Sequence, residues 1–104
     1  MVYRVASKLS SLSKKYKFNL IFKCSFDKAN RSSHKSKRSQ MSLNAAMDIL
    51  KTIKKDFKLA VTTDVHETSQ ISKLVEYIDV IQIPAFLSRQ TDLIIAAADT
   101  QKII

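Results

Sequence analysis

The chain has 104 residues, 45 % of them hydrophobic, which is enough for one small domain with a modest core and too apolar for a disordered tail. Its apolar runs are too short to span a bilayer, and its one cysteine, Cys24, excludes an internal disulfide and a cysteine-based zinc site. The formal charge of +9 is uneven, because residues 1–58 carry 15 Lys and Arg against 3 Asp and Glu, whereas residues 59–104 carry 3 against 6. The basic half can attract nucleic acid, a membrane surface or a phosphorylated small molecule, and charge alone does not choose among them.

Residues 5–16 are predicted to form an amphipathic helix, because Val5, Leu9 and Leu12 recur at helical spacing. Residues 1–26 contain no acid and are rich in Ser, Lys and Arg, which also matches the composition of an organellar transit peptide. Since the apolar positions lead directly into the next predicted element, a helix of the domain is the preferred interpretation.

Residues 18–26 alternate between apolar and polar side chains, which is the period of a strand with one buried face. The apolar face carries Phe22, Cys24 and Phe26. We therefore expect Cys24 to be a core residue rather than a nucleophile.

Helix caps and the spacing of apolar side chains predict the remaining elements. A long exposed loop at 28–40 is followed by a helix at 43–57, capped by Ser42, and by a strand at 59–63. Next come a helix capped by Thr68 or Ser69, with apolar positions up to Ile78, and a strand at 79–84. The last element is a helix at 92–100 capped by Thr91, in which Asp92 interacts favourably with the helix dipole. A helix followed by three strand–helix units predicts an α/β fold with parallel strands and right-handed crossovers, in one domain spanning residues 1–104.

The chain contains no glycine, although glycine makes up about 7 % of average proteins. Tight turns usually need it, because glycine adopts positive φ at little cost. Either the loops avoid positive φ, or the sequence has drifted or is part of something larger.

Polar residues that do not cap helices gather where the predicted strands end. They are Lys23, Ser25, Lys28 and Asn30 after the first strand, Asp64 and His66 after the second, and Gln82 and Arg89 at the third. In open α/β sheets and in α/β barrels, ligands bind at this edge. The pattern therefore predicts a ligand site at the carboxyl ends of the strands.

Lys23, Lys28 and Arg31 make this predicted site cationic. Solvation alone explains a lysine on the polar face of a two-layer sheet, whereas a lysine inside a barrel needs an anionic partner, because a buried unpaired ammonium is costly. Lys28 and Arg31 supply donors suited to phosphate. The basic run at 34–38 has no aromatic residue and is typical of a solvated loop, so nucleic acid is not the expected partner.

Asp64 and His66 are two positions apart at a strand end, which directs both side chains to one face. The pair suits acid/base chemistry or half of a metal site, but two ligands are too few for a metal ion. Binding of a substrate hydroxyl by Asp64 is the simpler interpretation. Gln82 lies between Ile81 and Ile83, and its amide needs a partner, either a ligand hydroxyl or a polar residue of a neighbouring strand.

Three segments together resemble one known family. KCSFDKANRSS, TDVHE and DVIQIPAFLSRQTDLIIAAA occur in the order and approximate spacing of the 3-deoxy-D-manno-octulosonate 8-phosphate synthases, called KDO-8-phosphate synthases or 2-dehydro-3-deoxyphosphooctonate aldolases. The resemblance extends from about Val5 to the end of the chain. It implies a (β/α)8 TIM barrel, of which this chain is a fragment from roughly the end of helix 1 through helix 4.

The resemblance also implies an activity. Members of the family are transferases that condense phosphoenolpyruvate with D-arabinose 5-phosphate and water, giving KDO-8-phosphate and inorganic phosphate for lipopolysaccharide biosynthesis. They are cytoplasmic homo-oligomers, tetramers in the family, and no membrane is implied as a partner. Both substrates are anionic phosphates, which suits the cationic site.

Site roles follow from the resemblance, motif by motif. It implies that Lys23, Ser25 and Lys28 contact phosphoenolpyruvate and that Asn30, Arg31 and Ser32 hold the arabinose phosphate. It implies that Asp64 and Gln82 lie near the sugar or the reacting centre. The segment with Pro84, Ala85, Phe86 and Arg89 is implied to reach a neighbouring subunit's site as well. The catalytic roles fall on Lys28, Asn30 and Asp64. The cations would orient two mutually repelling anions and stabilise the charge that develops during attack.

A complete (β/α)8 barrel takes about 250 residues, so several strands and the later Lys, Arg and His residues of the family's site are absent from this chain. The Cys, His, Glu and Asp that bind a divalent metal ion in the family's metal-dependent class are absent too, so no cofactor is assigned to this segment. SQMS also stands where the family has a Gly-Pro-Gly turn. We therefore expect a fragment of a synthase that is inactive alone; the alternatives are a small basic module that binds anions or nucleic acid, and an inert product of a truncated gene.

Overall fold

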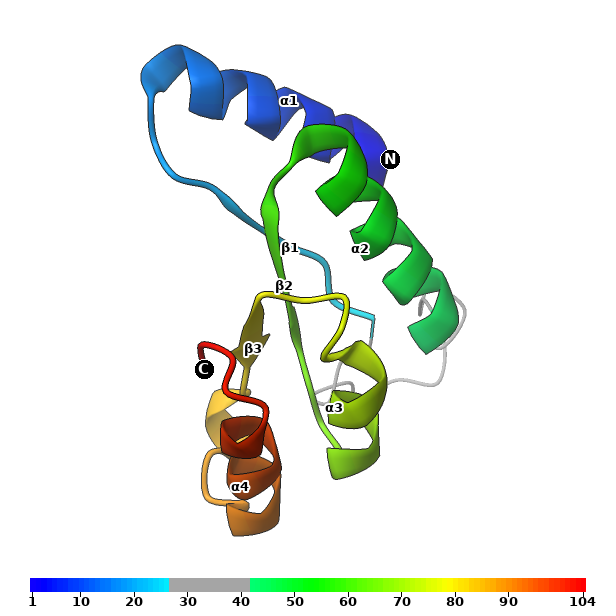
Figure 1. Cartoon of the computed structure of the whole chain (residues 1–104), viewed down its shortest axis with the longest axis vertical. Helices are drawn as coiled ribbons and strands as arrows, with labels where there is room; N and C mark the ends of the chain where they lie inside the picture. Colours follow the sequence, from blue (N-terminus) through cyan, green and yellow to red (C-terminus); the bar gives the residue numbers. More distant parts are fainter. Residues whose placement is uncertain (27–41) are drawn as a thin grey trace.

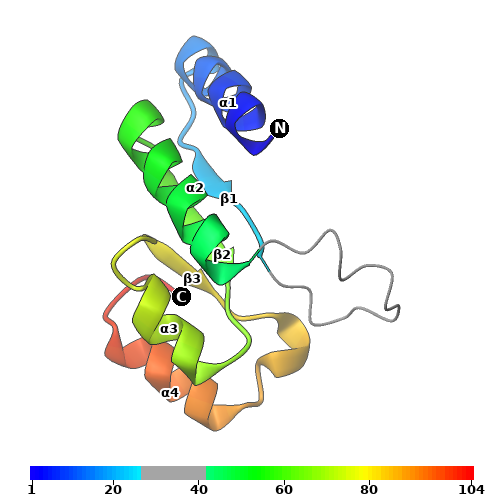
Figure 2. The same cartoon turned by 90° about the vertical axis from the view of Figure 1, so that its right-hand side faces the viewer.

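The computed structural model describes residues 1–26 and 42–104. In this part of the chain the elements are, in order, α1 (Val2–Tyr16), β1 (Ile21–Lys23), α2 (Leu43–Phe57), β2 (Ala60–Asp64), α3 (Thr68–Leu74), β3 (Val80–Gln82), the 3₁₀ helix η2 (Ala85–Leu87) and α4 (Thr91–Asp99). The two views in Figures 1 and 2 place α1 and α2 at one end of the short sheet and α3 and α4 at the other. The predicted alternation of strands and helices is confirmed.

The three strands form a parallel sheet in the order β1-β2-β3. Lys23, Thr62 and Val80 lie side by side across it. Beyond β3, Ile103 forms a parallel bridge with Val80, and the Ile81 N–H donates to the Ile103 carbonyl at 2.8 Å. The predicted α/β class with parallel strands is confirmed, and the arrangement is that of part of a (β/α) barrel.

One face of the sheet is buried under the helices. Its buried side chains are Phe22, Cys24, Val61, Thr63, Val65 and Ile81. Side chains from every α-helix of the described chain pack into the same cluster, among them Ala6, Leu50, Leu74 and Leu93. Burial of apolar surface of this kind supplies about 25 cal/mol per Å² and is the main force that holds the helices on the sheet.

The opposite face of the sheet is open, and we call it the open face. It carries Ile21, Lys23, Thr62, Val80 and Gln82, because successive side chains of a strand point to opposite sides. Ile21, Lys23 and Gln82 are exposed there, and Thr62 and Val80 are half-buried. The alternation predicted for residues 22–26 is confirmed, and in a closed barrel the open face is the one that lines the interior.

The outer strands are shorter than predicted. β1 comprises Ile21–Lys23 instead of 18–26, and β3 comprises Val80–Gln82 instead of 79–84. β1 begins where the central strand begins, since Ile21 pairs with Ala60, and β3 ends where it ends, since Gln82 pairs with Asp64. The central strand thus fixes the start of β1 and the end of β3, whereas Cys24 and Asp79 lie outside the regular strands although β2 continues beside them.

Helix α1 begins at Val2, and its predicted apolar face is confirmed in part, because Leu9 packs against the core and Leu12 is half-buried. Ala6 and Ser10 are buried, whereas Val5 is 47 % exposed. The helix packs on α2, where the Tyr3 hydroxyl donates to Asp56 Oδ2 at 2.9 Å. The prediction of Val5 as part of the apolar face was therefore wrong, because the position of α2 decides which side of α1 is covered.

Two of the three predicted helix caps were wrong. Ser42 caps α2 as predicted, and its hydroxyl accepts from the Ala45 N–H at 3.2 Å. Helix α3 is capped by Glu67 in a capping box with Gln70 rather than by Thr68 or Ser69. Helix α4 has Gln90 at its N-cap, so Thr91 is the first helical residue instead, while Asp92 lies in the first turn as predicted.

The turns do not avoid positive φ, although the chain has no glycine. Lys17 and Lys58 end α1 and α2 in the left-handed region with φ of 56° and 52°, and Gln101 follows α4 with φ of 61°. Each side chain adds a steric cost that glycine would not have.

Candidate functional site

The carboxyl ends of the strands bring three predicted site residues to one edge of the sheet. β1 ends at Lys23, β2 at Asp64 and β3 at Gln82, and the strands are parallel. Asp64 and Gln82 are direct neighbours in the pairing of β2 with β3. Lys23 and Gln82 belong to the open face, and Asp64, which shares the side of β2 that carries Thr62, is buried at the same edge. Side chains from three separate parts of the sequence therefore come to one edge of the sheet.

Four predicted site residues lie outside the described part of the chain. They are Lys28, Asn30, Arg31 and Ser32. Their roles stay predictions from the sequence.

Asp64 and His66 form the most buried polar pair of this edge. Asp64 Oδ2 lies 3.2 Å from His66 Nε2, and their side chains are only 12 % and 8 % exposed. Their spacing in the sequence predicted that the two side chains share a face, and the distance confirms it. The contact suits an ion pair or a donated hydrogen bond, depending on where the imidazole carries its proton.

His66 is held on two sides. Its ring meets the ring of buried Phe26 edge-on, with the centroids 6.4 Å apart. Its backbone N–H donates to Gln70 Oε1 at 2.8 Å, and the neighbouring Glu67 N–H donates to the same oxygen at 3.2 Å. The first turn of α3 thus fixes the backbone of His66. Sequence reasoning gave Gln70 no part in this edge, although its position three residues after Glu67 is the spacing of a capping box.

The second oxygen of Asp64 lacks a hydrogen bond. Oδ1 is buried and has no partner among the residues that the structure describes. A buried acceptor without a donor costs about 1–3 kcal/mol, and more when it is charged. Such an atom in a native protein calls for a water molecule or a ligand donor.

Lys23 and Gln82 are exposed, as residues of the open face. The exposed Gln82 amide is accessible to solvent, and its role toward a ligand stays a prediction. Gln82 is exposed because none of the helices in residues 1–26 and 42–104 lies over this face of β3. Ser25, two residues after Lys23, is half-buried.

The remaining predicted site residues form a turn after β3. Pro84 is buried and precedes η2, in which Ala85 and Phe86 are exposed; Arg89 follows, also exposed. The Leu87 N–H donates to the Pro84 carbonyl at 2.9 Å, which closes the 3₁₀ turn. Sequence reasoning missed this turn, and Pro84, whose φ suits the entry to a helix, was the available signal.

Cys24 lies on the buried face and is a core residue, as predicted. Burial raises the pKa of its thiol, and the negative charge of Asp64 raises it further. The thiol therefore stays protonated near neutral pH, a form that is a poor nucleophile.

Neither a metal site nor a membrane-spanning helix is found in the described residues. Across residues 1–26 and 42–104, no group of three or more His, Cys, Asp or Glu side chains is arranged to hold a metal ion. Within the same residues, no helix combines the length and apolar character that crossing a bilayer requires.

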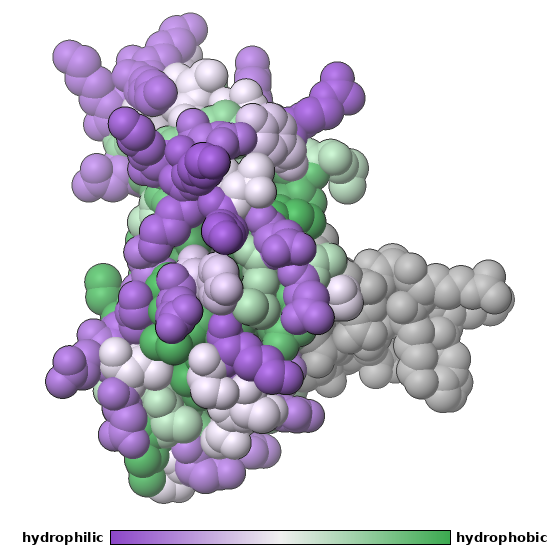
Figure 3. Space-filling model, turned by 45° about the vertical axis from the view of Figure 1, so that its right-hand side comes forward, coloured by the Kyte–Doolittle hydropathy of each residue, from purple (hydrophilic) through white to green (hydrophobic). Residues whose placement is uncertain are grey.

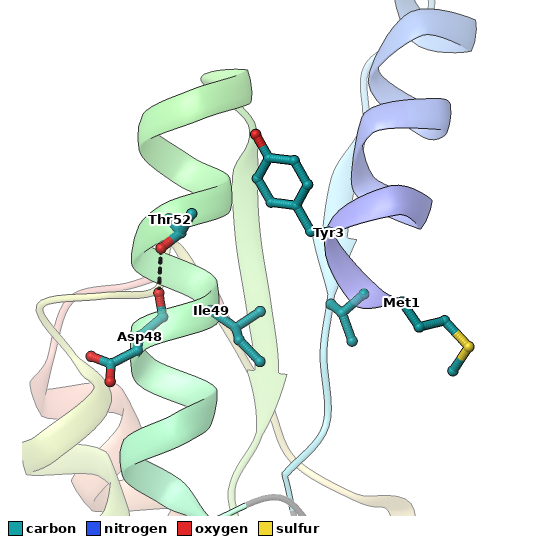
Figure 4. A pocket seen from close by; sticks show the side chains of 6 residues that line it. Met1, Tyr3, Asp48, Ile49 and Thr52 are labelled. Carbon is teal, nitrogen blue, oxygen red and sulfur yellow. Dashed lines mark hydrogen bonds between the residues drawn. The ribbon is translucent and has the colours of Figure 1, made fainter.

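A pocket of about 320 Å³ lies between α1 and α2, away from the predicted site. Its lining residues are Met1, Val2, Tyr3, Asp48, Ile49 and Thr52. Figure 4 shows the Tyr3 ring beside α2 and the Thr52 hydroxyl donating to the Asp48 carbonyl, a bond within the helix of 2.9 Å. None of the residues that the family motifs assign to substrate lines this pocket, so it is not the candidate site.

Hydrophilic side chains cover much of the surface in Figure 3, most densely at the end formed by α1 and α2. Exposed cations of α1 are Arg4, Lys8, Lys14 and Lys15. This basic end is separate from the edge that carries Asp64.

Comparisons with known proteins agree with the resemblance seen in the motifs. Residues 1–104 match the model of the DAHP synthetase I family. The chain is 45 % identical over 104 residues to a 2-dehydro-3-deoxyphosphooctonate aldolase of Wolinella succinogenes, covering 100 % of this chain and 39 % of that protein. It is 48 % identical over 103 residues to 2-dehydro-3-deoxyphosphooctonate aldolase 2 of Arabidopsis thaliana, covering 99 % of this chain and 35 % of that protein. It is 43 % identical over 102 residues to a 2-dehydro-3-deoxyphosphooctonate aldolase of Rhizobium meliloti, covering 98 % of this chain and 36 % of that protein. The chain thus spans less than two fifths of the length of these curated relatives.

Proposed function

Because this chain belongs to the DAHP synthetase I family, we propose that it carries part of the substrate site of a KDO-8-phosphate synthase. The observation that carries the proposal is the convergence of Lys23, Asp64 and Gln82 at one sheet edge. Relatives 43–48 % identical to the chain bear the name of this enzyme. The reaction is the condensation of phosphoenolpyruvate with D-arabinose 5-phosphate and water, which yields KDO-8-phosphate and phosphate.

In this proposal the residues of the edge divide the work between two anions. Lys23 and Ser25, with Lys28, hold phosphoenolpyruvate, while Asp64 accepts a hydrogen bond from a hydroxyl of the sugar phosphate. Asn30, Arg31 and Ser32 bind the sugar's phosphate, and the Pro84–Phe86 segment and Arg89 complete the site. Cations at this edge lower the repulsion between the two anionic substrates and orient the enol carbon toward the aldehyde.

The whole enzyme would need more of the barrel than this chain contains. The chain spans 35–39 % of the relatives named above. We propose that the complete protein works in the cytoplasm as a homo-oligomer, as the family resemblance implies, and that the 104-residue chain has no turnover alone.

The proposal is tested by titrating the chain with phosphoenolpyruvate and following backbone amide resonances, together with an assay of phosphate release with both substrates. We expect shifts at residues 23–25 and 64–66, weakened several-fold by Lys23→Ala, and no phosphate release. Lys73→Ala, which removes an exposed lysine of α3, is the matched control and should bind like the parent chain. Shifts elsewhere only, or equal loss in both variants, would refute the assignment of Lys23, and turnover by the chain alone would refute its incompleteness.

The basic surface of α1 supports a second candidate, a module that binds polyanions. Its exposed cations, Arg4, Lys8, Lys14 and Lys15, are accompanied by no acidic residue within the helix. Binding to RNA or DNA that falls steeply with salt and maps to α1 would favour this candidate.

A further inference from the structure

We propose that His66 is a positioning residue that holds the Asp64 carboxylate through a hydrogen bond from Nε2–H, leaving Oδ1 as the acceptor for one hydroxyl of a sugar phosphate. This inference rests on the proposed function for the identity of the ligand. It gives a role to His66, which lies in the TDVHE motif but to which the resemblance assigned none.

Asp64 and His66 are in direct contact. The 3.2 Å between Asp64 Oδ2 and His66 Nε2 lies within the range of an N–H···O hydrogen bond. An ionised carboxylate can only accept, so the contact is favourable only when Nε2 carries a proton. The small exposure of both side chains makes this bond stronger than the same bond in water.

Neighbouring groups hold the imidazole of His66 in place. Phe26 packs edge-on against the ring, and Gln70 Oε1 accepts from the backbone N–H of His66. Because Gln70 also belongs to the capping box at Glu67, the start of α3 determines where the ring lies. His66 therefore transmits the geometry of α3 to the carboxylate at the end of β2.

The other oxygen of the Asp64 carboxylate, Oδ1, lacks a hydrogen bond within the described residues. Oδ2 is engaged by His66, while Oδ1 is buried without a hydrogen-bond partner in the described residues. A carboxylate whose orientation is fixed offers Oδ1 in one direction, which suits a single hydroxyl donor of a polyol. Lys23 of β1 pairs with Thr62, two residues before Asp64 on β2, so the same ligand can present its phosphate end to the basic part of this edge.

The proton on Nε2 is tested first, by nitrogen-15 NMR of the imidazoles in the 104-residue chain. We expect a protonated Nε2 whose resonance moves in Asp64→Asn, and His66→Phe identifies the signal by removing it, since His34 is the other histidine. A bare Nε2 in the parent chain, or a resonance insensitive to Asp64→Asn, would overturn the proposal.

The positioning role is tested by titrating D-arabinose 5-phosphate into matched variants. His66→Phe keeps a ring against Phe26 and removes the donor, so we expect about tenfold weaker binding. His66→Gln restores an N–H near the place of Nε2 and should recover most of the affinity. Unchanged amide spectra away from residues 64–70 show that both variants keep the fold.

The outcomes separate this inference from the proposed function. Equal binding by the parent chain and His66→Phe, or loss in His66→Phe without recovery in His66→Gln, refutes the positioning role while the proposed function stands. If the Nε2 proton responds to Asp64→Asn but the sugar phosphate does not bind the parent chain, the contact stands and the proposed ligand site fails.

Discussion

Asp79 links three elements of the molecule through one carboxylate. Oδ1 accepts from Lys54 Nζ of α2 at 2.8 Å, and Oδ2 accepts from the Val61 N–H of β2 at 2.9 Å, while Asp79 itself immediately precedes β3. Partial burial raises the pKa of this carboxyl, but the bonds from Lys54 and Val61 outweigh burial and lower the pKa overall. The sequence placed Asp79 at the start of a strand without revealing either partner.

We predict that Asp79 makes stability depend on pH. A lowered folded-state pKa means that the stabilisation is present above the unfolded pKa of about 3.9 and is lost as pH falls through the folded value. Asp79→Asn should lower the free energy of unfolding by about 1 kcal/mol at pH 7, a modest amount because the Lys54 and Asp79 side chains are 41 % and 33 % exposed. Urea unfolding of both proteins from pH 7 to pH 2.5 should show the difference disappearing in acid; a difference independent of pH would contradict this role.

At the scale of elements, the ends of α1 and α2 show the cost of a chain without glycine. Lys17 and Lys58 both end helices in the left-handed region, a position that favours glycine. The helices nevertheless end there because the following residues must turn back toward β1 and β2. Helix periodicity predicted where α2 ends, but it did not reveal the sign of φ at Lys58.

We predict that Lys58→Gly stabilises the chain by about 0.5–1 kcal/mol, because glycine relieves the left-handed strain despite its greater freedom when unfolded. Lys55→Gly, three residues earlier and within the helix, is the matched control and should destabilise by about 1 kcal/mol. Thermal and urea unfolding measure both changes. A loss of stability in Lys58→Gly would show that this lysine does not adopt positive φ.

At the scale of the whole molecule, the helices of the described residues cover one face of the sheet and leave the other uncovered. Large apolar side chains remain exposed on or next to the sheet, with Ile21 51 %, Ile103 69 % and Ile104 54 % exposed. Exposed strand edges and apolar patches promote association with other chains. The exposed isoleucines therefore make association through this face favourable.

We predict that the 104-residue chain self-associates through this face as its concentration rises. Ile21→Lys, which puts a charge on β1, should shift the sedimentation profile toward monomer. Val5→Lys removes a similarly exposed apolar side chain from α1 and should leave association unchanged. Equal effects of both variants would show that general hydrophobicity, rather than the open sheet, drives association.

The amino-acid sequence by itself determined the order of the elements, the parallel α/β class and the family motifs. These are local or short-range properties: apolar spacing sets helix or strand, Ser42 caps α2, and the alternation at residues 22–26 sets which side chains are buried. The convergence of Lys23, Asp64 and Gln82 followed as well, because parallel strands bring their carboxyl ends to one edge.

Only the tertiary structure decided how long the outer strands are, which side of α1 is buried, and which polar groups of the edge are exposed. These properties depend on neighbours distant in the sequence: β2 fixes where β1 begins and where β3 ends, Ala6 rather than Val5 is buried, and Gln82 is exposed where Asp64 is buried. Residue spacing placed Asp64 and His66 on one face, but the 3.2 Å contact between them arises from α3 and Phe26, which hold the ring in place. Burial and hydrogen bonding belong to the packed molecule, because a side chain's environment is made by whatever element lies over it.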